Sequence, residues 1–519
     1  MREGRDKNYK YQSAWMRYAY PDEQVRFLSS EEDDLLKICD CIDMSSGRPC
    51  GRSDGGIPIH YENDKLYTLK SGPHTRVQGE TGSGKSRTIC RGAAISAMLS
   101  DQSIVLTDPK GEIFEDPKIQ YLLQERNYDV HALDFRRFDK DGFNVFSYIV
   151  EMTKLGKHDQ ASDAINRFAG MLVNSKKADD DFWNDQAGDM IKAVLSFTLQ
   201  ALREKEELEK FHLATMQRYI SQDHDKMRRM TNALLEEHSF MTLFDHPVYD
   251  PLQTYADILA NPDRTYACIV SSANALLSAF CGSEKLMRML SVNSFQIQDF
   301  YRKPSALFLI VPDEVSAYDI LVGYIIDTMY QVLVSSYSDL YQGKCPASCG
   351  IKFICDEIAS LKINDMSNKI SASRSRQIDW TLIYQSDRQM EHAYPDDFES
   401  IRGNCRTHIF LGSSDYEIMK GISDETGVTR LSEGGAAEPV VSVEDLRRIE
   451  RRMAYKEALV MRGHYIYCAQ LPDYDSYKFL RSGRPLKLRN CVEKKRIQIY
   501  TIDDLCEDAA DGTVKLEYA

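Results

Sequence analysis

Short runs of apolar residues alternate along much of the chain with longer stretches in which apolar positions follow helical spacing. In the first third of the chain, runs typical of buried strands occupy residues 74–78, 103–108 and 129–135. Helical spacing lies between them, at 85–100 and 117–127. Strand-like runs resume later in the chain, at 306–314, 350–361, 378–386 and 406–413. Strands that alternate with helices predict an α/β fold with a doubly wound, mainly parallel sheet.

Between the two α/β stretches, apolar positions follow almost only helical spacing. The pattern therefore predicts an all-α domain, residues 156–289, inserted into an α/β domain made of 71–155 and 290–485. Residues 1–70 form a polar N-terminal region without a clear strand–helix rhythm. The C-terminal tail, 486–519, contains the acidic run DDLCEDAADG, and we expect it to be mobile.

The most apolar stretch, residues 317–338, is interrupted by Asp319 and Asp327. It falls short of the ~20 apolar residues that a membrane span needs, so we expect a buried helix here. The N-terminus lacks the apolar core of a signal peptide, and its sequence predicts no transmembrane helix.

Composition and charge narrow the class of protein. Apolar residues make up 43% of the chain and charged residues 28%, which is typical of a globular protein. The net charge of −14 argues against free, non-specific affinity for DNA, although a channel with a local basic lining remains compatible with it. The 13 cysteines are scattered without a CxxC pair, so we expect reduced cysteines and find no zinc motif.

Residues 79–86 read GETGSGKS, which fits the phosphate-loop pattern G-x-x-x-x-G-K-[ST] and lies between a predicted strand and a predicted helix. Backbone N–H groups at the start of such a helix bind phosphate, and glycines let the backbone approach the anion closely. We expect Lys85 to reach the β- and γ-phosphates and Ser86 to hold Mg²⁺. The predicted nucleotide contacts are Gly79, Glu80, Thr81, Gly82, Ser83, Gly84, Lys85, Ser86 and Arg87.

Mg²⁺ in such a site also needs a carboxylate at a strand end, and two pairs compete for this role. Asp313 and Glu314 follow an apolar run through Pro312, and proline ends a strand early because it lacks a backbone donor. The run IKFIC instead leads directly into Asp356 and Glu357. We therefore predict Asp356 as the metal-side carboxylate and Glu357 as the base that orients or activates water. This pair favours a nucleoside triphosphatase.

Two further polar positions fit a hydrolytic site. Gln385 ends the next apolar run, where an amide beside the phosphate loop would sense the γ-phosphate; the alternative is a surface glutamine. Upstream, the segment SASRSRQ carries Arg374 and Arg376. A guanidinium there could stabilise the charge that develops on the γ-phosphate of a neighbouring subunit. A solvated basic turn explains the two arginines equally well.

Taken together, these motifs resemble the type IV secretion coupling proteins, the TraG/TraD-like conjugative DNA-transfer ATPases. The resemblance covers about residues 75–478. Besides the phosphate loop it rests on VLTDPKGEIFED (105–116), FNVFSYI (143–149), FWNDQAGDMIKAVL (182–195), FICDEIASL (353–361) with SRSRQIDWTLIYQS, and EALVMRGHYIYCAQLPDYDSY (457–477). The DPKGE segment is far more specific than the loop.

The resemblance implies a RecA-like P-loop motor domain with an inserted all-α domain, and ATP and Mg²⁺ as cofactors. It also implies a homo-hexameric ring at the cytoplasmic face of the cell membrane. Such a ring recruits single-stranded DNA bound to a relaxase, or a protein substrate, and drives or gates its transfer into the secretion channel. Carried over residue by residue, the catalytic set is Lys85, Glu357, Arg374 and Gln385, with Ser86 and Asp356 at the metal. Arg374 lies 11 positions before Gln385, where the family places an arginine that acts in trans.

The sequence departs from the family in two places. Many members carry N-terminal membrane helices, which this sequence lacks, so we expect either membrane contact through a partner or an anchor that is encoded separately. Val145 stands where the family often has proline. The resemblance gives no residue-level mechanism for Asp108, Lys110 or Glu112.

Two alternative functions remain open. One is a recruitment platform whose ATPase only gates handover of the substrate. The other is an FtsK-like double-stranded DNA translocase, against which the helical insertion and the DPKGE segment weigh.

Overall fold

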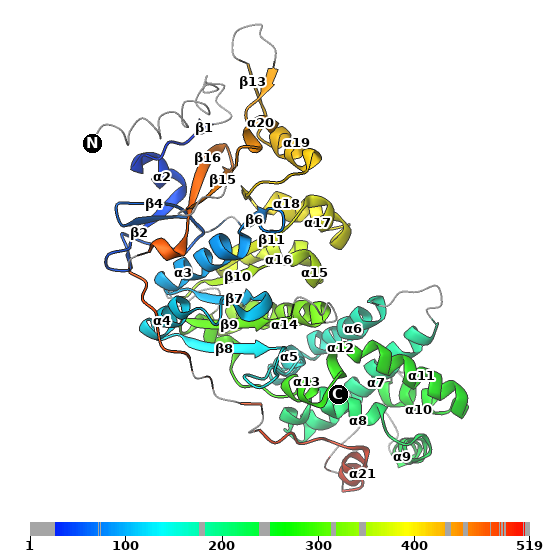
Figure 1. Ribbon diagram of the computed structural model, residues 1–519. Helices are drawn as coiled ribbons and strands as arrows, with labels where there is room; N and C mark the ends of the chain where they lie inside the picture. The colour runs from blue at the N-terminus through cyan, green and yellow to red at the C-terminus, as the bar shows by residue number, and fades with distance from the viewer. Residues whose placement is uncertain are drawn as a thin grey trace, which may run out of the picture. The chain divides into compact units, whose positions relative to one another are not determined.

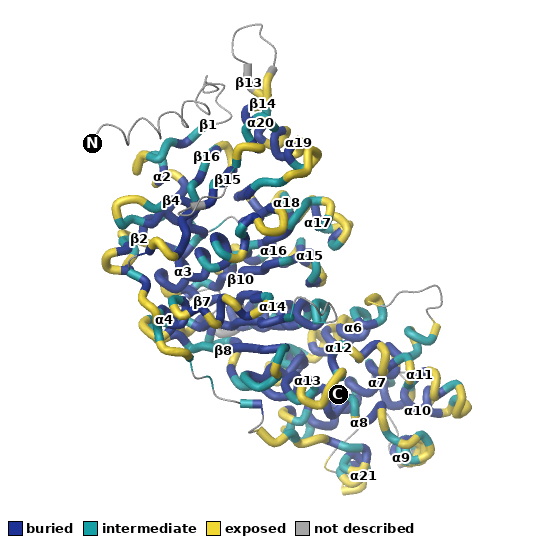
Figure 2. The backbone as a smooth tube through the Cα atoms, in the orientation of Figure 1, coloured by how far each residue is buried: buried dark blue, intermediate teal, exposed yellow. Residues whose placement is uncertain are grey.

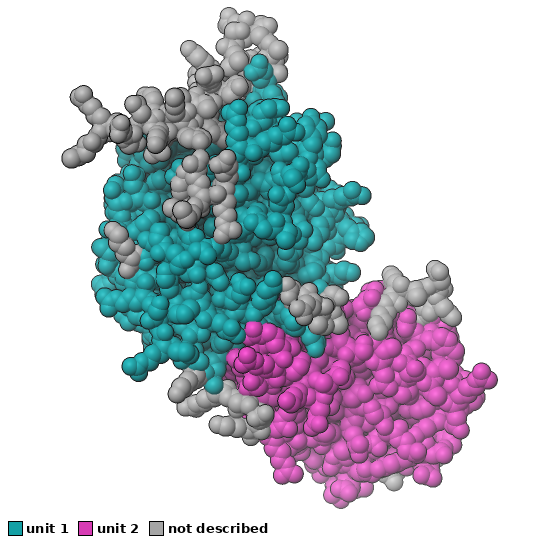
Figure 3. Space-filling model, viewed as in Figure 1, with its two compact units in different colours: residues 1–132, 298–319, 334–488 teal, residues 133–297, 320–333, 489–519 magenta. Residues whose placement is uncertain are grey.

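The computed structural model divides the chain into two compact units (Figure 3). It describes residues 26–511 and 513, except 71, 73, 176–181, 238–249, 313–317, 342–348, 431–436, 450–454, 478, 487, 489–490 and 493–494. Unit 1 comprises residues 1–132, 298–319 and 334–488, and unit 2 comprises 133–297, 320–333 and 489–519. The alternative carboxylates Asp313 and Glu314 lie outside the described residues.

Ten strands of the described chain join in one sheet, in the order β1-β16-β15-β12-β6-β11-β10-β7-β9-β8 (Figure 1). From β12 to β9 every neighbouring pair is parallel. Strand β15 is antiparallel to both β12 and β16. The bounds are β1 Arg26–Phe27, β6 Thr75–Gln78, β7 Ser103–Thr107, β8 Asp129–Asp134, β9 Ser305–Ile310, β10 Ile351–Cys355, β11 Ile378–Tyr384, β12 Thr407–Phe410, β15 Tyr455–Arg462 and β16 Tyr465–Pro472.

The parallel strands are the buried centre of unit 1 (Figure 2). Every residue of β6, β7, β9, β10 and β12 is buried. Parallel strands covered on both faces have continuous apolar sequences, because both sides of the strand need apolar partners. The predicted strands are therefore all present, and the prediction of a mainly parallel α/β sheet is confirmed.

Helices and a small hairpin surround this sheet. Helix α3 packs on β7 and β10, and α15, α16 and α17 pack on β11. The helix after the phosphate loop begins with a π-helical segment, η2, Lys85–Cys90. The helices of unit 1 are α2 Glu32–Ile38, α3 Arg91–Leu99, α4 Pro117–Glu125, α15 Ile358–Leu361, α16 Met366–Ser373, α17 Asp387–Ala393, α18 Phe398–Asn404, α19 Tyr416–Glu425 and α20 Val443–Leu446, and the hairpin is β13 Val428–Arg430 with β14 Ala437–Pro439.

A four-stranded antiparallel sheet, in the order β3-β2-β5-β4, lies in the region whose sequence has no clear rhythm. Its strands are β2 Cys39–Asp43, β3 Arg48–Pro49, β4 Pro58–Glu62 and β5 Lys65–Leu69. A two-residue turn joins β4 to β5, and both of its residues have positive φ, 53° at Asn63 and 59° at Asp64. Such turns favour Asn and Asp, so this pair is the signal that predicts the hairpin.

Unit 2 is predominantly helical. Its long helix α7 packs against α6, α10 and α11. The backbone N–H of Val145 donates to Leu290 O at 3.2 Å, a bond that the family's proline could not make. The helices are α5 Ser147–Lys154, α6 His158–Asn174, α7 Phe182–Glu204, α8 Leu213–Ile220, α9 His224–Glu237, α10 Pro251–Leu259, α11 Asp263–Leu276, α12 Ser278–Cys281 and α13 Glu284–Met289.

The apolar stretch around residue 330 forms the long helix α14, Asp319–Tyr341. It is the one helix of the described chain that is long and apolar enough, by composition, to cross a membrane. Of its apolar window, 78% is buried inside the fold. A core helix of a globular domain passes the same test, so this burial agrees with the predicted buried helix.

The sequence predicts a mobile acidic tail, whereas part of that tail forms helix α21, Ile502–Ala510, in unit 2. Leu505 on this helix is fully buried. Thr501 and Asp504 form a capping box at its start, and Lys205 Nζ lies 2.8 Å from Asp508 Oδ1. The acidic residues therefore cap a helix and pair with basic groups, and the expectation of mobility is wrong for this segment.

Candidate nucleotide site

The phosphate loop leaves the C-terminal end of β6 and enters the helix that begins at Lys85. The Lys85 side chain is buried, and its Nζ donates to the carbonyl oxygens of Gly79, at 2.7 Å, and Glu80, at 3.2 Å. These bonds hold the ammonium charge against the loop itself. A phosphate bound by the loop's N–H groups would therefore meet this charge directly.

The loop requires glycine at three positions, by backbone conformation at Gly82 and Gly84 and by close packing at Gly79. Gly82 and Gly84 have φ values of +82° and +93°, which L-residues other than glycine rarely adopt. A Cβ on Gly79 would lie 2.6 Å from Ser83 Oγ. That hydroxyl is buried and has no hydrogen-bond partner among the described residues. A close-fitting loop with an unsatisfied donor fits the phosphate group of a nucleotide.

The two predicted metal ligands are in contact. Ser86 Oγ donates to Asp356 Oδ2 at 2.9 Å, although 270 residues separate them in the chain. Asp356 follows β10 directly and is buried. A hydroxyl and a carboxylate side by side are the hard oxygen ligands that Mg²⁺ takes in proteins, so the donor set fits this ion.

Thr107, the last residue of β7, holds the Asp356 backbone in place. Its Oγ1 accepts from Asp356 N at 2.7 Å and donates to Asp356 O at 3.1 Å. The sequence motifs give Thr107 no role of its own. A polar residue at the end of an apolar strand, level with the end of β10, is the signal that points to it.

Glu357 and Gln385 also come together. Gln385 Nε2 lies 3.3 Å from Glu357 Oε1 and 3.4 Å from Oε2. Gln385 follows β11, which lies between the loop strand β6 and the strand β10 that precedes Asp356. Glu357 has φ of +54°, a left-handed conformation that costs a non-glycine residue about 1 kcal/mol or more. Its carboxylate thus accepts from Gln385, while its backbone N–H donates to Asp356 Oδ1 at 3.1 Å.

A third carboxyl group lies at this edge of the sheet. Asp319, the first residue of α14, follows β9 in the chain. Burial, together with the charge of Glu357, raises the pKa of Asp319 to about 6. Carboxyl groups with raised pKa values gather at functional sites, because such sites place like charges in partly buried surroundings. In the sequence, Asp319 is visible only as an interruption of an apolar run.

The remaining loop residues face a pocket of about 470 Å³, lined by Glu80 to Ser83 on one side and by Ser414 and Lys456 among others. Glu80 Oε2 accepts from both the backbone N and the Oγ of Ser414, each at 2.9 Å. The Glu80 side chain is therefore bonded to the segment after β12. Thr81 and Gly82 are exposed.

Arg87, predicted to contact the nucleotide, makes its contacts elsewhere. Its Nε donates to Asp473 Oδ2 at 2.7 Å, and its Nη2 donates to Asp473 Oδ1 at 3.1 Å and to Asp475 Oδ2 at 2.5 Å. Both carboxylates belong to the segment that follows β16. The Arg87 side chain thus bonds to these two carboxylates, whereas the other predicted nucleotide contacts belong to the phosphate loop itself.

Arg374 lies at the other end of the sheet. It belongs to the turn that precedes β11, whereas Gln385 follows that strand. A Cβ on Gly72, ahead of β6, would lie 4.0 Å from Arg374 Nε. The phosphate loop is at the opposite end of β6. The structure therefore does not bring Arg374 to the Lys85 site of the same chain.

The DPKGE segment turns sharply after β7. The buried carboxylate of Asp108 accepts from Ile113 N at 3.1 Å and Phe114 N at 2.7 Å, and so holds the turn closed. Lys110 is exposed, with φ of +79°. Glu112 Oε2 lies 3.7 Å from Arg91 Nη2, on the helix that follows the phosphate loop.

Comparison with known proteins gives a family and a fold. The family model described as "Type IV secretory system Conjugative DNA transfer" matches residues 43–489. The structure of the plasmid coupling protein TrwB in complex with ADP and Mg²⁺ is similar, with a TM-score of 0.57 and 16% identity, over 89% of this chain and 95% of that one. The trigonal form of the bacterial conjugative coupling protein TrwBdeltaN70 with sulphate gives 0.55 and 14%, over 93% and 99%. A comparison with curated protein sequences finds no match.

These similarities show the fold. It is a RecA-like P-loop NTPase domain, with a doubly wound, mainly parallel sheet, and an inserted all-α domain, as the sequence predicts.

Proposed function

The chain belongs to the type IV secretory system conjugative DNA transfer family, and on this premise we propose that it is an ATP-hydrolysing coupling protein. It recruits DNA bound to a relaxase, or a protein substrate, and drives or gates its transfer into a secretion channel. The observation that carries the hydrolytic part is the contact of Ser86 with Asp356 beside the pair Glu357 and Gln385. One edge of the sheet thus holds groups for metal, water and phosphate.

The cofactors we propose are ATP and Mg²⁺. Lys85 and the loop N–H groups bind the phosphates, and Ser86 and Asp356 hold the metal. Bound there, Mg²⁺ supplies positive charge that neutralises the phosphate oxygens. Glu357 orients the attacking water and accepts its proton, and Gln385, whose amide lies 3.3 Å from Glu357 Oε1, senses the γ-phosphate.

We propose that Arg374 acts in trans. It lies at the end of β11 opposite Gln385, so it is turned away from its own site and is available to a neighbour's. A guanidinium supplied across a subunit boundary stabilises charge on the transferred phosphoryl group. This role requires a neighbouring copy of the chain, and we propose that the copies form a homo-hexameric ring.

The finer assignments are proposals of the same kind. We propose that the protein acts at the inner face of the membrane, and that a separate partner provides the membrane contact. The division into a motor domain of 71–155 and 290–485 and an all-α domain of 156–289 stays a prediction.

The test compares Lys85→Ala with the surface variant Lys37→Ala in ATP hydrolysis, with and without single-stranded DNA. We expect Lys85→Ala to lose hydrolysis and substrate transfer while its thermal unfolding is unchanged. Lys37, which pairs on the surface with Asp34, serves as the control and should leave both activities unchanged. Transfer that survives Lys85→Ala contradicts the motor.

A second measurement separates a motor from a recruitment platform. Displacement of a labelled strand from naked DNA, with hydrolysis stimulated by single strands, supports a motor. Relaxase binding without either supports the platform. Movement on double-stranded DNA alone supports the FtsK-like alternative.

A further inference from the structure

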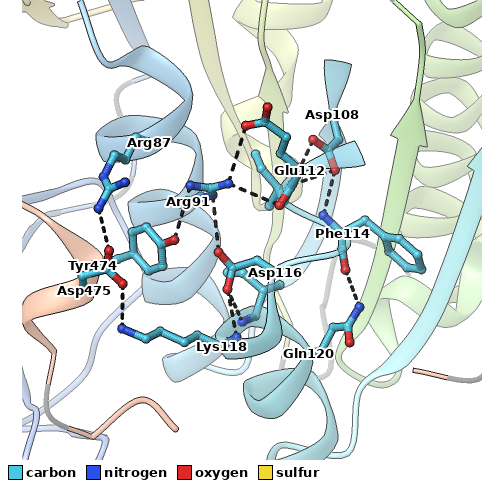
Figure 4. A network of polar contacts seen from close by, with 12 residues as sticks. Arg87, Arg91, Asp108, Glu112, Phe114, Asp116, Lys118, Gln120, Tyr474 and Asp475 are labelled. Atoms are coloured by element: carbon cyan, nitrogen blue, oxygen red, sulfur yellow. Dashed lines mark hydrogen bonds and ion pairs between the residues drawn. The ribbon is translucent and has the colours of Figure 1, made fainter. Parts of the chain in front are cut away.

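Three segments far apart in the sequence are joined by polar contacts around the helix that carries Lys85 and Ser86 (Figure 4). They are this helix, through Arg87 and Arg91; the DPKGE segment and the start of α4; and the turn η8, Tyr474–Ser476, after β16. We call these contacts the C-terminal clamp. All of its members lie in unit 1.

Arg87 is held by two carboxylates. Its two hydrogen bonds to Asp473, at 2.7 and 3.1 Å, form a bidentate pair, and Asp475 accepts a third at 2.5 Å. Asp475 also accepts from Lys118 Nζ at 2.8 Å. A bidentate arginine pair fixes direction as well as distance. The residue next to Ser86 is thus fastened in a set orientation.

The Tyr474 ring lies among three cations. The ring centroid is 5.5 Å from the Arg87 guanidinium carbon, 5.1 Å from that of Arg91 and 5.3 Å from Lys118 Nζ. Arg91 Nη1 also lies 3.4 Å from the Tyr474 hydroxyl. Cations within about 6 Å of an aromatic ring are attracted to it. Tyr474, which is itself buried, therefore joins the helix to the start of α4.

The DPKGE turn completes the clamp. Arg91 Nη2 donates to Glu112 O at 3.3 Å, and Arg91 Nε lies 3.6 Å from Asp116 Oδ2. Asp116 caps α4 by accepting from Lys118 N at 2.8 Å. Asp108 holds the turn closed, as described above. The segment that most strongly indicates the family thus packs against the phosphate-loop helix.

The most exposed ion pair of the clamp, Arg87 with Asp475, contributes little to stability. The Arg87 side chain is 36% exposed and that of Asp475 51% exposed. Exposed ion pairs contribute only about 0–1 kcal/mol to stability. The pairs of Arg87 with Asp473 and of Arg91 with Asp116 are less exposed, and they lie one turn apart on the helix that carries Lys85 and Ser86. They therefore bear on where those two side chains stand.

We propose that Arg87 is a positioning residue, and that through Asp473 the C-terminal clamp sets the phosphate-loop helix in its nucleotide-binding orientation. This assigns Arg87 a role other than the direct phosphate contact expected from the sequence. It also gives the DPKGE segment and the turn after β16 a common function. The proposal rests on the proposed function, because it concerns the affinity of that site for nucleotide.

A double-mutant cycle tests the proposal, with Arg87→Gln, Asp473→Asn and the two combined in the full-length protein. A fluorescent ADP analogue reports nucleotide affinity at equilibrium, and steady-state hydrolysis gives KM and kcat. We expect each single change to weaken nucleotide binding about tenfold, and the double change to be no worse than either. KM for ATP rises by the same factor, while kcat stays within about twofold. Arg87→Lys keeps the charge without the bidentate geometry, so we expect an intermediate affinity.

The alternatives give different results. If Arg87 binds phosphate directly, Arg87→Gln weakens binding and Asp473→Asn, which frees the arginine, does not. Additive effects in the double variant, or wild-type affinity in both single variants, also overturn the proposal. If a single variant misfolds, Arg87→Lys and Asp475→Asn replace it in the same affinity assay. Weaker nucleotide binding in both supports the proposal, and wild-type affinity in both contradicts it.

A matched control and a direct binding assay keep the outcomes separate. Arg302→Gln removes an exposed ion pair with Asp299 elsewhere in unit 1, at 3.3 Å, and should leave affinity and KM unchanged. Because binding of the ADP analogue does not need hydrolysis, a wild-type protein that binds nucleotide but does not hydrolyse it contradicts the proposed function alone. Unaffected binding in the variants contradicts the clamp alone.

Discussion

Mixing subunits that carry Lys85→Ala with subunits that carry Arg374→Ala tests whether the lysine and the arginine of one active site belong to different chains. At ~3.3 Å per residue, the seven residues of this strand span ~23 Å. Arg374 precedes the strand, and Gln385 follows it beside the phosphate loop. An arginine side chain is far shorter than this distance, so Arg374 cannot reach the nucleotide site of its own chain in this fold.

The expected result follows from counting sites. Each variant alone lacks one component at every site and is inactive, because a trans arginine contributes about 10³–10⁵-fold to the rate. In a ring mixed at random, an Arg374→Ala subunit supplies an intact loop, and a Lys85→Ala neighbour supplies an intact arginine. At equal amounts, about a quarter of the sites in a closed ring combine both. For sites that hydrolyse independently, ATP hydrolysis should therefore recover to about a quarter of the wild-type rate, and coupling between neighbouring sites would shift the recovered rate from this value.

The assay is ATP hydrolysis over a series of mixing ratios, after subunit exchange verified by energy transfer between labelled subunits. The recovered rate should rise to a maximum at equal amounts and fall on either side. Verified exchange with no recovery at any ratio contradicts an action in trans. An Arg374→Ala protein that keeps its full rate alone removes the arginine from the mechanism.

Three further predictions concern the carboxyl group of Asp319, the proposed Mg²⁺ ligand Asp356 and the helix α21. Because the pKa of Asp319 is raised to about 6 beside Glu357, and that of a free carboxyl is near 4, stability is lost as pH rises from 4 to 6 and stays lost at pH 7. Asp319→Asn should thus raise the free energy of unfolding by about 1 kcal/mol at pH 7, after allowance for solvent screening, and leave it unchanged at pH 4; an equal gain at both values in urea titrations contradicts this. Asp356→Asn should abolish Mg²⁺-dependent hydrolysis but preserve binding of an ADP analogue in EDTA, and hydrolysis that keeps its Mg²⁺ dependence would show that another carboxylate holds the metal. Leu505→Ala should lower the free energy of unfolding by about 2–4 kcal/mol in urea, whereas a mobile tail would show no change.

The parallel sheet and the positions of Asp356 and Gln385 follow from the sequence for one physical reason. Strands covered on both faces need uninterrupted apolar runs, and parallel strands end at a common edge. Polar residues directly after such runs, Asp356 and Gln385, are therefore brought to the phosphate loop. The structure places Asp356 against Ser86 and Gln385 against Glu357, as this reasoning expects.

Other features depend on contacts that have no local signal. The small sheet of residues 39–69 consists of strands of five residues or fewer, which are too short to give a clear period. In the sequence, the acidic residues of α21 indicate a mobile segment. In the fold, they pair with Lys205 and cap the helix. The position of Arg87 depends on Asp473, 386 residues further along the chain. In each case the local structure depends on a residue that is distant in the sequence, and the pattern of neighbouring residues does not identify that partner.

Strand β11 has one further consequence for a ring built as we propose. The turn before it carries the arginine that we propose acts on a neighbour, and the residue directly after it is the glutamine that contacts Glu357. A strand buried in the centre of a sheet moves as a rigid body, so a shift at one end is passed to the other. Occupancy of one nucleotide site would thus alter catalysis at the next. Such coupling is reciprocal for binding, so neighbouring sites should not titrate independently with nucleotide.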